Sequence, residues 1–368
     1  MNKSRCMSLA GGVSNSWFLS IVCATLLSAF GVTTVQGQDA QDEMKSGPTA
    51  SDYAAAEDAH VIYRHAKPAN TAAGAMLKQK QITEHGSAAT SAGATPSTDD
   101  NDQLRFPADL TYNGGAVVRV AESHAIFLLP NGKCPIATCW GNPEGFLRDL
   151  NTSEFIHITD PYVSATANGR YPVGGHLNVS YKPTSKTAPL TDADLQAFVH
   201  KAVLNTFKGQ AGYSHIYHVF LPPGQDVCFT AKDGICYSPD VPATFSFCGY
   251  HSSMDFSDIG HVLYTVEPFQ NVAGCSVRPG TPNGQLVDST NNTLSHEAFE
   301  TITDPDGTAW FNFTSVVLQF QEIGDECSFF VPTATGAFFD PSVSMIGLHR
   351  YAVQPEYTNS EHACASNP

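Results

Sequence analysis

The feature that most constrains this chain is its set of cysteines. Ten are present, and eight of them lie between residues 134 and 364. The two others, Cys6 and Cys23, fall in a segment that we expect to be removed. An even number of cysteines in an exported chain favours disulfide bonds, and the absence of C-x-x-C spacing argues against a thiolate zinc site. Eight cysteines allow 105 connectivities, so the sequence alone does not fix the pairs. Because short loops are the easiest to close, the favoured set is Cys134–Cys139, Cys228–Cys236, Cys248–Cys275 and Cys327–Cys364.

Residues 1–37 have the pattern of a secretory signal peptide. Lys3 and Arg5 precede a mostly apolar, uncharged run over 17–35, and we place the cleavage after Gly37. A retained membrane anchor is the alternative, but serines and a glycine interrupt the run and make it short for a span. We therefore expect a secreted protein, in the extracellular space, the periplasm or at the cell surface, without membrane association after the peptide is removed.

Residues 38–107 are dominated by Ala, Ser, Thr, Gly and Asp. Such a stretch cannot bury enough apolar surface to offset its ordering entropy, so we predict a disordered low-complexity linker. From about Leu110, apolar runs separated by Gly, Pro and Asn turns continue to Ala365. This change of texture predicts one folded extracellular domain over 108–368.

The balance of charges restricts the partners of that domain. The formal net charge is −16, from 19 basic and 35 acidic side chains. Binding to phosphates requires a basic face, so the charge balance disfavours nucleic acids and anionic membrane surfaces as partners. We expect an extracellular peptide or a cell-wall or matrix component instead. The sequence indicates no oligomeric state.

Hydrophobic periodicity predicts two main helices and several strands. Thr191 and Asp194 have the pattern of a capping box, and apolar residues from Leu195 to Phe207 recur at three- and four-residue spacing. A second helix is predicted over roughly 292–303. Because helices and strands mix without strict alternation, the fold class is α+β or an irregular α/β with a mixed sheet. The predicted strands cover 116–120, 125–129, 176–181, 216–221, 244–250, 261–266 and 345–353.

One segment carries recognisable chemistry, the run S-H-E-A-F-E-T-I-T-D-P at 295–305. Residues four apart share a face of a helix, so His296 and Glu300 are expected to project together. Pro305 should end the helix and leave Asp304 free to turn toward the same point. An imidazole with two carboxylates is a ligand set for zinc or another divalent cation. Glu297 stands where H-E-x-x-H metallopeptidases have their general base.

Two further segments are candidates to complete this site. The acidic turn 322–327 has a glycine between its carboxylates, which makes Asp325 a candidate ligand and Glu322 an additional one. Carboxylates are also the oxygen ligands that calcium uses, although zinc is favoured here. His251, directly after a predicted strand, is another additional candidate ligand.

Each of these features has a plainer interpretation. His296 and Glu300 could form a surface pair that contributes a few tenths of a kcal/mol. The acidic turn could be solvated, and His251 could be a hydrogen-bonded structural histidine. Other histidines on or beside strands, such as His215, are read as core or edge residues. Aromatic side chains that could stack on sugars are more typical of a buried core: Trp140, Trp310 and Tyr357.

The polar segment belongs to an ordered set of blocks. It is followed by Ala309-Trp310-Phe311 and then by Glu322-x-Gly324-Asp325-x-Cys327. In this order the blocks resemble secreted bacterial proteins of uncharacterised function, which are distantly similar to the Exordium or phosphate-induced family of plant cell-wall proteins. The resemblance covers roughly 108–368. Further blocks of the same kind are Tyr217–Pro222 with Cys228, Cys248–Ser252, and Tyr351–Asn359 with Cys364.

The resemblance implies export, disulfides and a shared fold, without an established activity. Carried over by position, the polar block of the family corresponds to His296, Glu297, Glu300, Asp304, Glu322 and Asp325. We therefore predict a secreted metal-dependent hydrolase, namely a zinc peptidase with Glu297 as base and the metal bound by His296, Glu300, Asp304 and Asp325. The alternative is a non-catalytic, Exordium-like extracellular protein with a structural metal or an acidic cluster.

Overall fold

The computed structural model describes residues 109–183, 188–229, 234–241, 243–311, 322–328, 330–333, 336–339 and 341–368. The predicted signal peptide, 1–37, and the predicted linker, 38–107, lie outside these residues. No helix within the described ranges is both long enough and apolar enough to cross a membrane.

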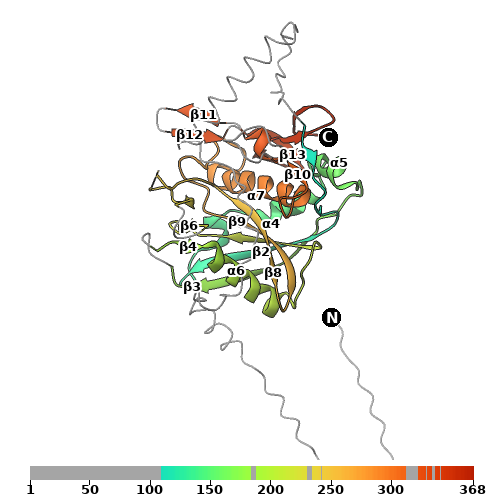
Figure 1. Cartoon of the computed structure of the whole chain (residues 1–368). Helices are drawn as coiled ribbons and strands as arrows, with labels where there is room; N and C mark the ends of the chain where they lie inside the picture. Colours follow the sequence, from blue (N-terminus) through green and yellow to red (C-terminus); the bar gives the residue numbers. More distant parts are fainter. Residues whose placement is uncertain are drawn as a thin grey trace, which may run out of the picture. The chain divides into compact units, whose positions relative to one another are not determined.

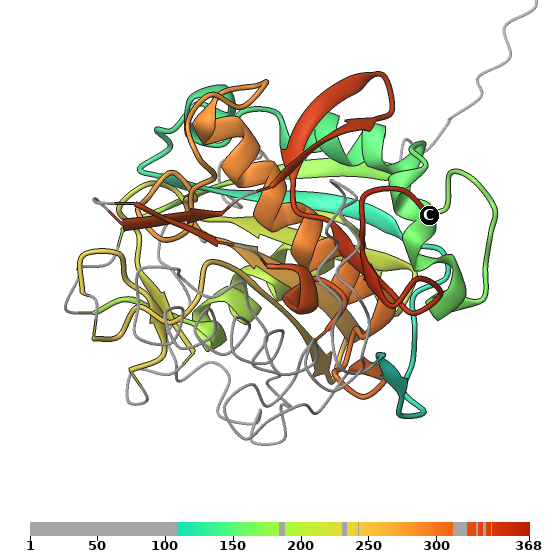
Figure 2. The same ribbon diagram turned by 90° about the horizontal axis from the view of Figure 1, so that it is seen from above.

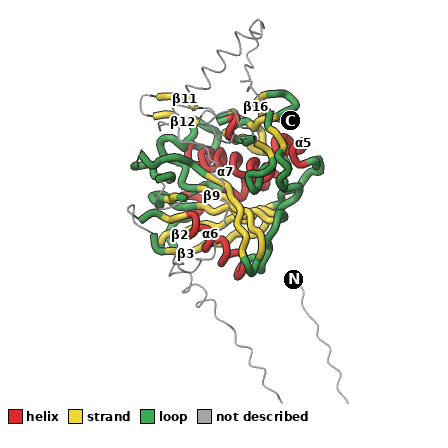
Figure 3. Tube along the Cα trace, in the orientation of Figure 1, coloured by secondary structure: helices red, strands yellow, loops and turns green. Residues whose placement is uncertain are grey.

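A five-stranded sheet forms the centre of the described domain (Figure 1, Figure 3). The first four strands in its order are parallel, and the last pairs antiparallel with its neighbour at one edge. This mixed sheet with helices in irregular order confirms the predicted fold class. The strands lie in the order β3 (Val173–Tyr181), β2 (Glu122–Pro130), β5 (His215–Phe220), β9 (Gly260–Glu267) and β8 (Tyr250–Phe256).

Helices cover both faces of this sheet. The longest helix, α7 (Gln285–Thr303), crosses one face together with α4 (Pro143–Asn151), and α6 (Asp192–Lys201) lies on the other (Figure 1, Figure 2). Side chains along β2 alternate accordingly. Phe127 belongs to the apolar cluster on the α7 side, and Ile126 belongs to the cluster on the α6 side. Because successive strand residues point to opposite faces, residues two apart on β2 share a face.

The predicted capping box starts α6. The Thr191 side chain accepts a hydrogen bond from the Asp194 amide at 3.3 Å, and the Asp194 carboxylate accepts one from the Thr191 amide at 2.8 Å. Two donors at the helix start are satisfied in this way. A π-helical turn, η3 (Ala202–Thr206), continues the helix toward Phe207.

Helix α7 is longer and more buried than its sequence suggests. It begins after Gly284, earlier than the predicted start at 292, and it ends at Asp304 as Pro305 requires. Every residue from Asp288 to Thr303 is buried. The polar side chains of this helix therefore lie inside the protein, where each needs a partner.

Shorter elements complete the described domain. The helical ones are α3 (Ile136–Cys139), η2 (Phe155–Thr159), α5 (Asp160–Val163) and η4 (Asp325–Cys327). The paired strands are β1 (Thr111–Tyr112) with β10 (Trp310–Phe311), β4 (Leu190–Thr191) with β6 (Val227–Cys228), β6 with β7 (Cys236–Tyr237), β11 (Phe330–Thr333) with β12 (Gly336–Phe339), β13 (Ser342–Ile346) with β14 (His349–Val353), and β15 (Glu356–Thr358) with β16 (Ala363–Ala365).

Three predicted strands differ from the structure, whereas the others coincide with β2, β3, β5 and β9. No strand forms at 116–120, where the Val118 amide donates to the Ile302 carbonyl at 2.9 Å. The segment 244–250 holds only an isolated bridge at Phe245 before β8 begins. The range 345–353 is a hairpin that turns at Gly347, whose φ of 61° glycine adopts without strain.

All four predicted disulfides are confirmed. Two of them hold segments that surround α7. Cys248–Cys275 ties the start of β8 to the loop before the helix, and Cys327–Cys364 ties η4 to β16. Each cross-link reduces the entropy of the unfolded chain and so stabilises the fold.

Candidate metal centre

His296 and Glu300 lie one turn apart on α7, as their spacing predicts. The His296 Nε2 atom is 3.0 Å from Glu300 Oε1. Both side chains are fully buried, so the interpretation as an exposed surface pair is wrong. Charges in the interior interact more strongly than charges at the surface because little water screens them. The helix therefore places a strongly interacting acid and base inside the protein.

A second imidazole reaches the same helix from β8. His251 Nδ1 is 3.6 Å from Glu297 Oε2 and 3.5 Å from Glu300 Oε2. Its other ring nitrogen, Nε2, lies 3.1 Å from the backbone carbonyl oxygen of Asp304. Because a carbonyl only accepts, Nε2 of the neutral ring carries the proton, and the Nδ1 lone pair faces the two carboxylates. Histidines that bind metals are commonly held in this way, with the far nitrogen donating to a carbonyl.

Gln354, which follows β14, orients His296 in a similar manner. His296 Nδ1 is 3.2 Å from Gln354 Oε1, and the Gln354 side-chain nitrogen donates to the Gly324 carbonyl at 2.7 Å. The second bond determines which end of the amide faces the ring, so His296 Nδ1–H donates to Oε1. In the neutral ring, the Nε2 lone pair then faces Glu300 at 3.0 Å and Asp325 at 3.8 Å.

The acidic turn packs against the His296 ring at Gly324. A β-carbon on Gly324 would lie 2.6 Å from His296 Nδ1, so a larger residue would displace the ring. The Asp325 amide donates to Glu300 Oε1 at 3.2 Å, and Glu322 Oε1 is 3.7 Å from His251 Nε2. The structure thus brings this segment to the helix, as the sequence predicts.

Asp304 does not join these ligands through its carboxylate. Its Oδ1 atom accepts a hydrogen bond from the Ala309 amide at 2.7 Å and closes the turn after α7. Its backbone carbonyl faces the site, toward His251. The helix ends where Pro305 predicts, but the carboxylate turns toward the following backbone amide instead.

The side chains around α7 form two groups of three that share one residue. His296, Glu300 and Asp325 form one group, and His251, Glu297 and Glu300 form the other. Within each group the candidate ligand atoms lie within 4.8 Å of one another. Glu300 turns Oε1 toward His296 and Oε2 toward His251. We call these five residues, together with Glu322, the α7 cluster.

Several polar atoms of the α7 cluster form no hydrogen bond with any described residue. They are both carboxylate oxygens of Glu297, Glu300 Oε2, His251 Nδ1 and His296 Nε2. Buried polar groups are normally hydrogen-bonded, and buried charges are paired or bound to a metal. Lone pairs that face one another repel unless a proton or a cation lies between them. The donor set and its unmet atoms therefore fit a bound cation.

The pKa values of the α7 cluster reflect its burial and the close approach of its acids and imidazoles. Burial and the neighbouring carboxylates raise the pKa of Glu297 well above its usual value. Burial also disfavours a charged Glu300, but the imidazoles of His296 and His251 outweigh it and lower the pKa of Glu300. For His296, burial opposes protonation, but Glu300 and Asp325 outweigh it and raise the pKa to about 10. Protons therefore take the positions between these groups when no cation does, and a metal ion would have to displace them.

Two further acids at the cluster escape sequence reasoning. Neither carboxylate oxygen of Glu356 is hydrogen-bonded to a described residue, and burial raises its pKa well above the usual value. Glu267 accepts a hydrogen bond from Thr265 at 2.8 Å, and burial raises its pKa to about 8. The sequence signal for each is a single acid at the boundary of a strand, because Glu267 ends β9 and Glu356 begins β15. These two residues add to the excess of carboxylates over imidazoles.

The three aromatic residues considered for sugar binding are part of the interior. Trp140 and Tyr357 are fully buried, and Trp140 Nε1 donates to the Leu221 carbonyl at 2.9 Å. Trp310 is partly buried, and its Nε1 donates to the Tyr162 carbonyl at 2.8 Å. The expected role of these rings as core residues is confirmed, and the surface that stacking on a sugar requires is missing at Trp140 and Tyr357.

Comparisons with known proteins add no assignment. No protein-family model, no curated protein and no solved structure matches this chain. The likeness to Exordium-related proteins therefore remains a prediction from the sequence blocks, and the functional argument rests on the geometry of the α7 cluster.

Proposed function

We propose that this protein is a secreted metal-dependent hydrolase whose α7 cluster holds two divalent cations that share Glu300. The position of Glu300 carries the proposal. Its two oxygens face two different imidazoles, Oε1 at 3.0 Å from His296 Nε2 and Oε2 at 3.5 Å from His251 Nδ1. A carboxylate in this position suits a two-metal site, in which the ions lie about 3.5–4 Å apart.

The ligand types favour zinc or another first-row transition metal. Each group of three contains one imidazole and two carboxylates, and imidazole nitrogen is a ligand that zinc and its neighbours prefer. Calcium fits less well because it takes about six to eight oxygen ligands and rarely nitrogen. The excess of buried carboxylates also supports two cations, since two imidazoles alone leave most of the acid charge uncompensated.

Solvent reaches the α7 cluster at Asp325. Its side chain is 17% exposed, whereas those of His251, His296, Glu297 and Glu300 are fully buried. We therefore assign the group containing His296 and Asp325 to the water molecule and the substrate. A bound ion would supply Lewis-acid activation of that water near neutral pH. Peptides are the first substrates to test, because the H-E-x-x-E spacing on a helix resembles that of metallopeptidases.

Glu297 is assigned to the interior group as a ligand. Its Oε2 atom faces His251 Nδ1, which is oriented by the Asp304 carbonyl as metal-binding histidines are. In H-E-x-x-H enzymes the residue at this position is instead a general base, which takes a proton from water. The two roles predict different metal contents for the same variant.

The test compares wild type with Glu297→Gln. We expect the α7 cluster of the wild-type protein to contain about two equivalents of metal, and the protein to cleave members of a fluorogenic peptide library. Glu297→Gln should lose turnover and about one equivalent of metal, measured by elemental analysis of the purified protein. Loss of turnover with full metal content would instead assign Glu297 as the base. The proposal would be contradicted if the purified wild-type protein contained no metal and if added metal did not change its melting temperature.

A matched control is available on α4. Glu144 is also a largely buried carboxylate, 15% exposed, and it pairs with Arg148 at 3.7 Å and with His176 at 3.1 Å. Glu144→Gln removes one acid of the same type outside the α7 cluster. It should retain wild-type metal content and turnover, which separates a specific ligand effect from a general effect of charge removal.

Complete burial of most of the cluster favours a second candidate, a structural metal in a non-catalytic extracellular protein. Five of its six side chains are fully buried, so ions could stabilise the fold without meeting a substrate. This function predicts that a chelator lowers the melting temperature while no library peptide is cleaved before or after metal is restored. Cleavage that depends on added metal would decide for the hydrolase.

A further inference from the structure

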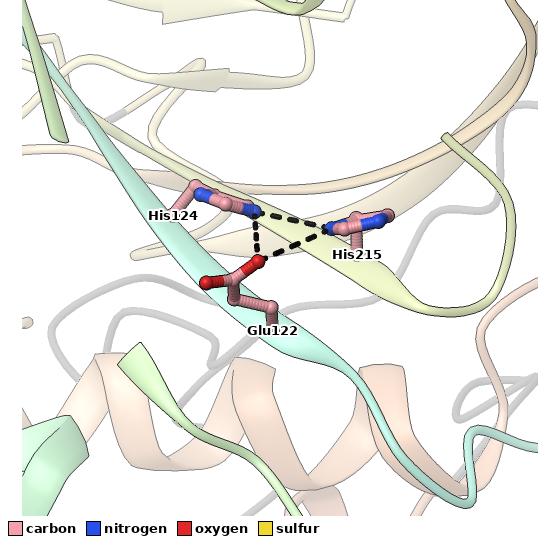
Figure 4. A group of neighbouring side chains, drawn as sticks. All are labelled: Glu122, His124 and His215. Carbon is pink, nitrogen blue, oxygen red and sulfur yellow. Dashed lines mark hydrogen bonds and ion pairs between the residues drawn. The ribbon is translucent and has the colours of Figure 1, made fainter. Parts of the chain in front are cut away.

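A separate group of metal-ligating side chains lies on the opposite face of the central sheet. Glu122 and His124 are two residues apart on β2, so they share a face, and His215 begins the neighbouring parallel strand β5. This is the face that carries α6, because His124 packs against Phe207 and Tyr217 of the α6-side core. Figure 4 shows the three side chains pointing toward one another from the two strands.

The three ligand atoms have the spacing of a transition-metal site. His124 Nε2 is 3.2 Å from His215 Nδ1, and Glu122 Oε2 is 3.6 Å from the first and 3.9 Å from the second. Ligands about 2.0–2.2 Å from a tetrahedral zinc ion are themselves about 3.3–3.6 Å apart. The point equidistant from the three atoms lies about 2.1 Å from each, which is the zinc bond length.

The backbone holds these side chains in place before any ligand binds. The pairing of β2 with β3 shifts register between Ser123 and Ala125, where His124 of β2 faces two residues of β3, Gly174 and Gly175. Gly174 of β3 lies against both ligands, and a β-carbon there would be 2.6 Å from His124 Cε1 and 2.7 Å from Glu122 Oε1. The His124 ring also stacks on Tyr217, with centroids 5.0 Å apart. The site is therefore preorganised.

The surroundings of the two rings favour the form that binds metals. Burial lowers the pKa of His124 and of His215, although Glu122 acts in the opposite direction. A metal ion binds the unprotonated imidazole, which this shift favours. A cavity of about 290 Å³ adjoins the group and is lined by Glu122, His124 and Lys208, among others. This cavity provides access for an ion and for a small anionic ligand.

We propose that Glu122, His124 and His215 form a second binding site for a divalent transition-metal ion, separate from the α7 cluster. Two histidines and one glutamate are the protein ligands of a class of zinc sites that keep a further position for water or substrate. Here the adjoining cavity would supply that ligand. The competing explanation is that His124 and His215 merely hydrogen-bond to each other at 3.2 Å.

The test is titration of the metal-stripped full-length protein with Zn²⁺, followed by calorimetry, and with Co²⁺, followed by visible absorption. Glu122→Gln and His215→Ala should each weaken the binding of one equivalent by at least about 100-fold, because loss of an outer-shell partner alone costs about 10–100-fold. The visible absorption of Co²⁺ bound in a four-coordinate site at this group should be lost together with that equivalent. Equivalents bound at the α7 cluster should be unchanged in both variants.

His176→Ala is the matched control, because His176 is a histidine of the neighbouring strand β3 that pairs with Glu144 and not with this group. It should bind Zn²⁺ as wild type does. Unchanged zinc stoichiometry and affinity in Glu122→Gln would overturn the proposal and leave a hydrogen-bonded histidine pair. The same loss in His176→Ala would also overturn it. Because the Glu122 side chain is 37% exposed, Glu122→Gln is expected to fold and decides the question even where His215→Ala does not.

Discussion

The two faces of one sheet hold two groups of ligands that differ in burial and charge. The α7 cluster is almost entirely buried and has more carboxylates than imidazoles. The group on the α6 face has two imidazoles with lowered pKa values and one carboxylate that is 37% exposed. Buried excess charge must be compensated by protons or cations, whereas a half-exposed carboxylate is solvated by water and has no such need. A cation at α7 would therefore stabilise the fold, and one at Glu122 would mainly add a binding function.

Replacement of Glu300, the carboxylate shared by the two groups of the α7 cluster, should give the largest difference in unfolding free energy between the two faces of the sheet. In metal-free Glu300→Ala, the buried His296 loses the carboxylate 3.0 Å from Nε2, and removal of one partner of a buried pair costs about 3–5 kcal/mol. Glu122→Ala removes a half-exposed carboxylate 3.6 Å from His124, for which we expect about 0–1 kcal/mol. Urea unfolding at pH 7 with chelator measures both free energies. Equal losses would show that burial does not distinguish the two groups.

Removal of the disulfide beside the acidic turn should give the second-largest difference in stability between the two faces. Cys327–Cys364 closes a separation of 37 residues and holds η4, whereas Cys134–Cys139 closes only 5. Loop-closure entropy predicts a loss of about 4 kcal/mol for the Cys327→Ser, Cys364→Ser double variant and about 2 kcal/mol for the shorter loop.

The position of each disulfide predicts which of the two proposed metal sites should bind zinc more weakly when that disulfide is removed. The longer one orders Asp325, so its removal should weaken metal binding at the α7 cluster and leave the Glu122 group unchanged. Thermal unfolding and zinc titration of both double variants provide the measurement. Weakened binding at both sites would indicate general unfolding.

Two glycines allow the same comparison of the two metal sites, because replacement by alanine adds a single methyl group beside one ligand of each site. A β-carbon would lie 2.6 Å from the His296 ring in Gly324→Ala and 2.6 Å from the His124 ring in Gly174→Ala. Each substitution should lower zinc affinity about 10–100-fold at its own site only, since it misorients one ligand. Gly175→Ala is the control, because its β-carbon meets nothing closer than 3.9 Å. An effect of Gly175→Ala as large as that of Gly174→Ala would contradict the role of this contact.

The response to pH should be the smallest effect, and His296 and Glu267 on one face should act in the opposite direction to His124 and His215 on the other. The raised pKa of His296, about 10, means that its contribution is complete below about 6.5 and is lost as the pH rises through 10. The pKa of Glu267 is about 8, so its contribution to the stability of the fold is likewise lost as the pH rises through that value. The pKa values of His124 and His215 are lowered, so their contribution is present above about 6.5 and is lost as the pH falls.

Unfolding of the metal-free protein as a function of pH checks these signs. Replacement of His296 with Gln should flatten the decline in stability at alkaline pH, because the proton bound only in the folded state is removed. Replacement of His124 with Gln should instead flatten the decline at acidic pH. Variants that alter the same limb of the curve would contradict the comparison.

Local sequence pattern predicted much of what is local in the structure. The capping box at Thr191 and the end of α7 before Pro305 follow from groups a few residues apart. The same holds for the pairing of His296 with Glu300, because residues four apart on a helix meet whatever surrounds them. The sequence also indicated the disulfides, since loop length limits the choice of partners. It did not indicate how deeply α7 is buried.

Only the tertiary structure brought the distant ligands together. His251 is a candidate on its own strand, but its approach to Glu297 depends on where β8 lies relative to α7. Gln354 and Glu356 come from the C-terminal strands, and no spacing in the sequence connects them with His296. The turn of Asp304 toward the Ala309 amide likewise followed from the loop after the helix.

The Glu122 group illustrates this division most directly. The sequence shows that Glu122 and His124 share a strand face, because side chains alternate along an extended backbone. It does not show that His215, about 90 residues later, begins the strand beside them, because a lone histidine beside a strand predicts only a core or edge residue. Parallel pairing of β2 with β5, with Glu122 opposite His215, made the three atoms converge. Helix and strand periodicity is written locally in the chain, whereas the register between strands depends on the packing of the whole domain.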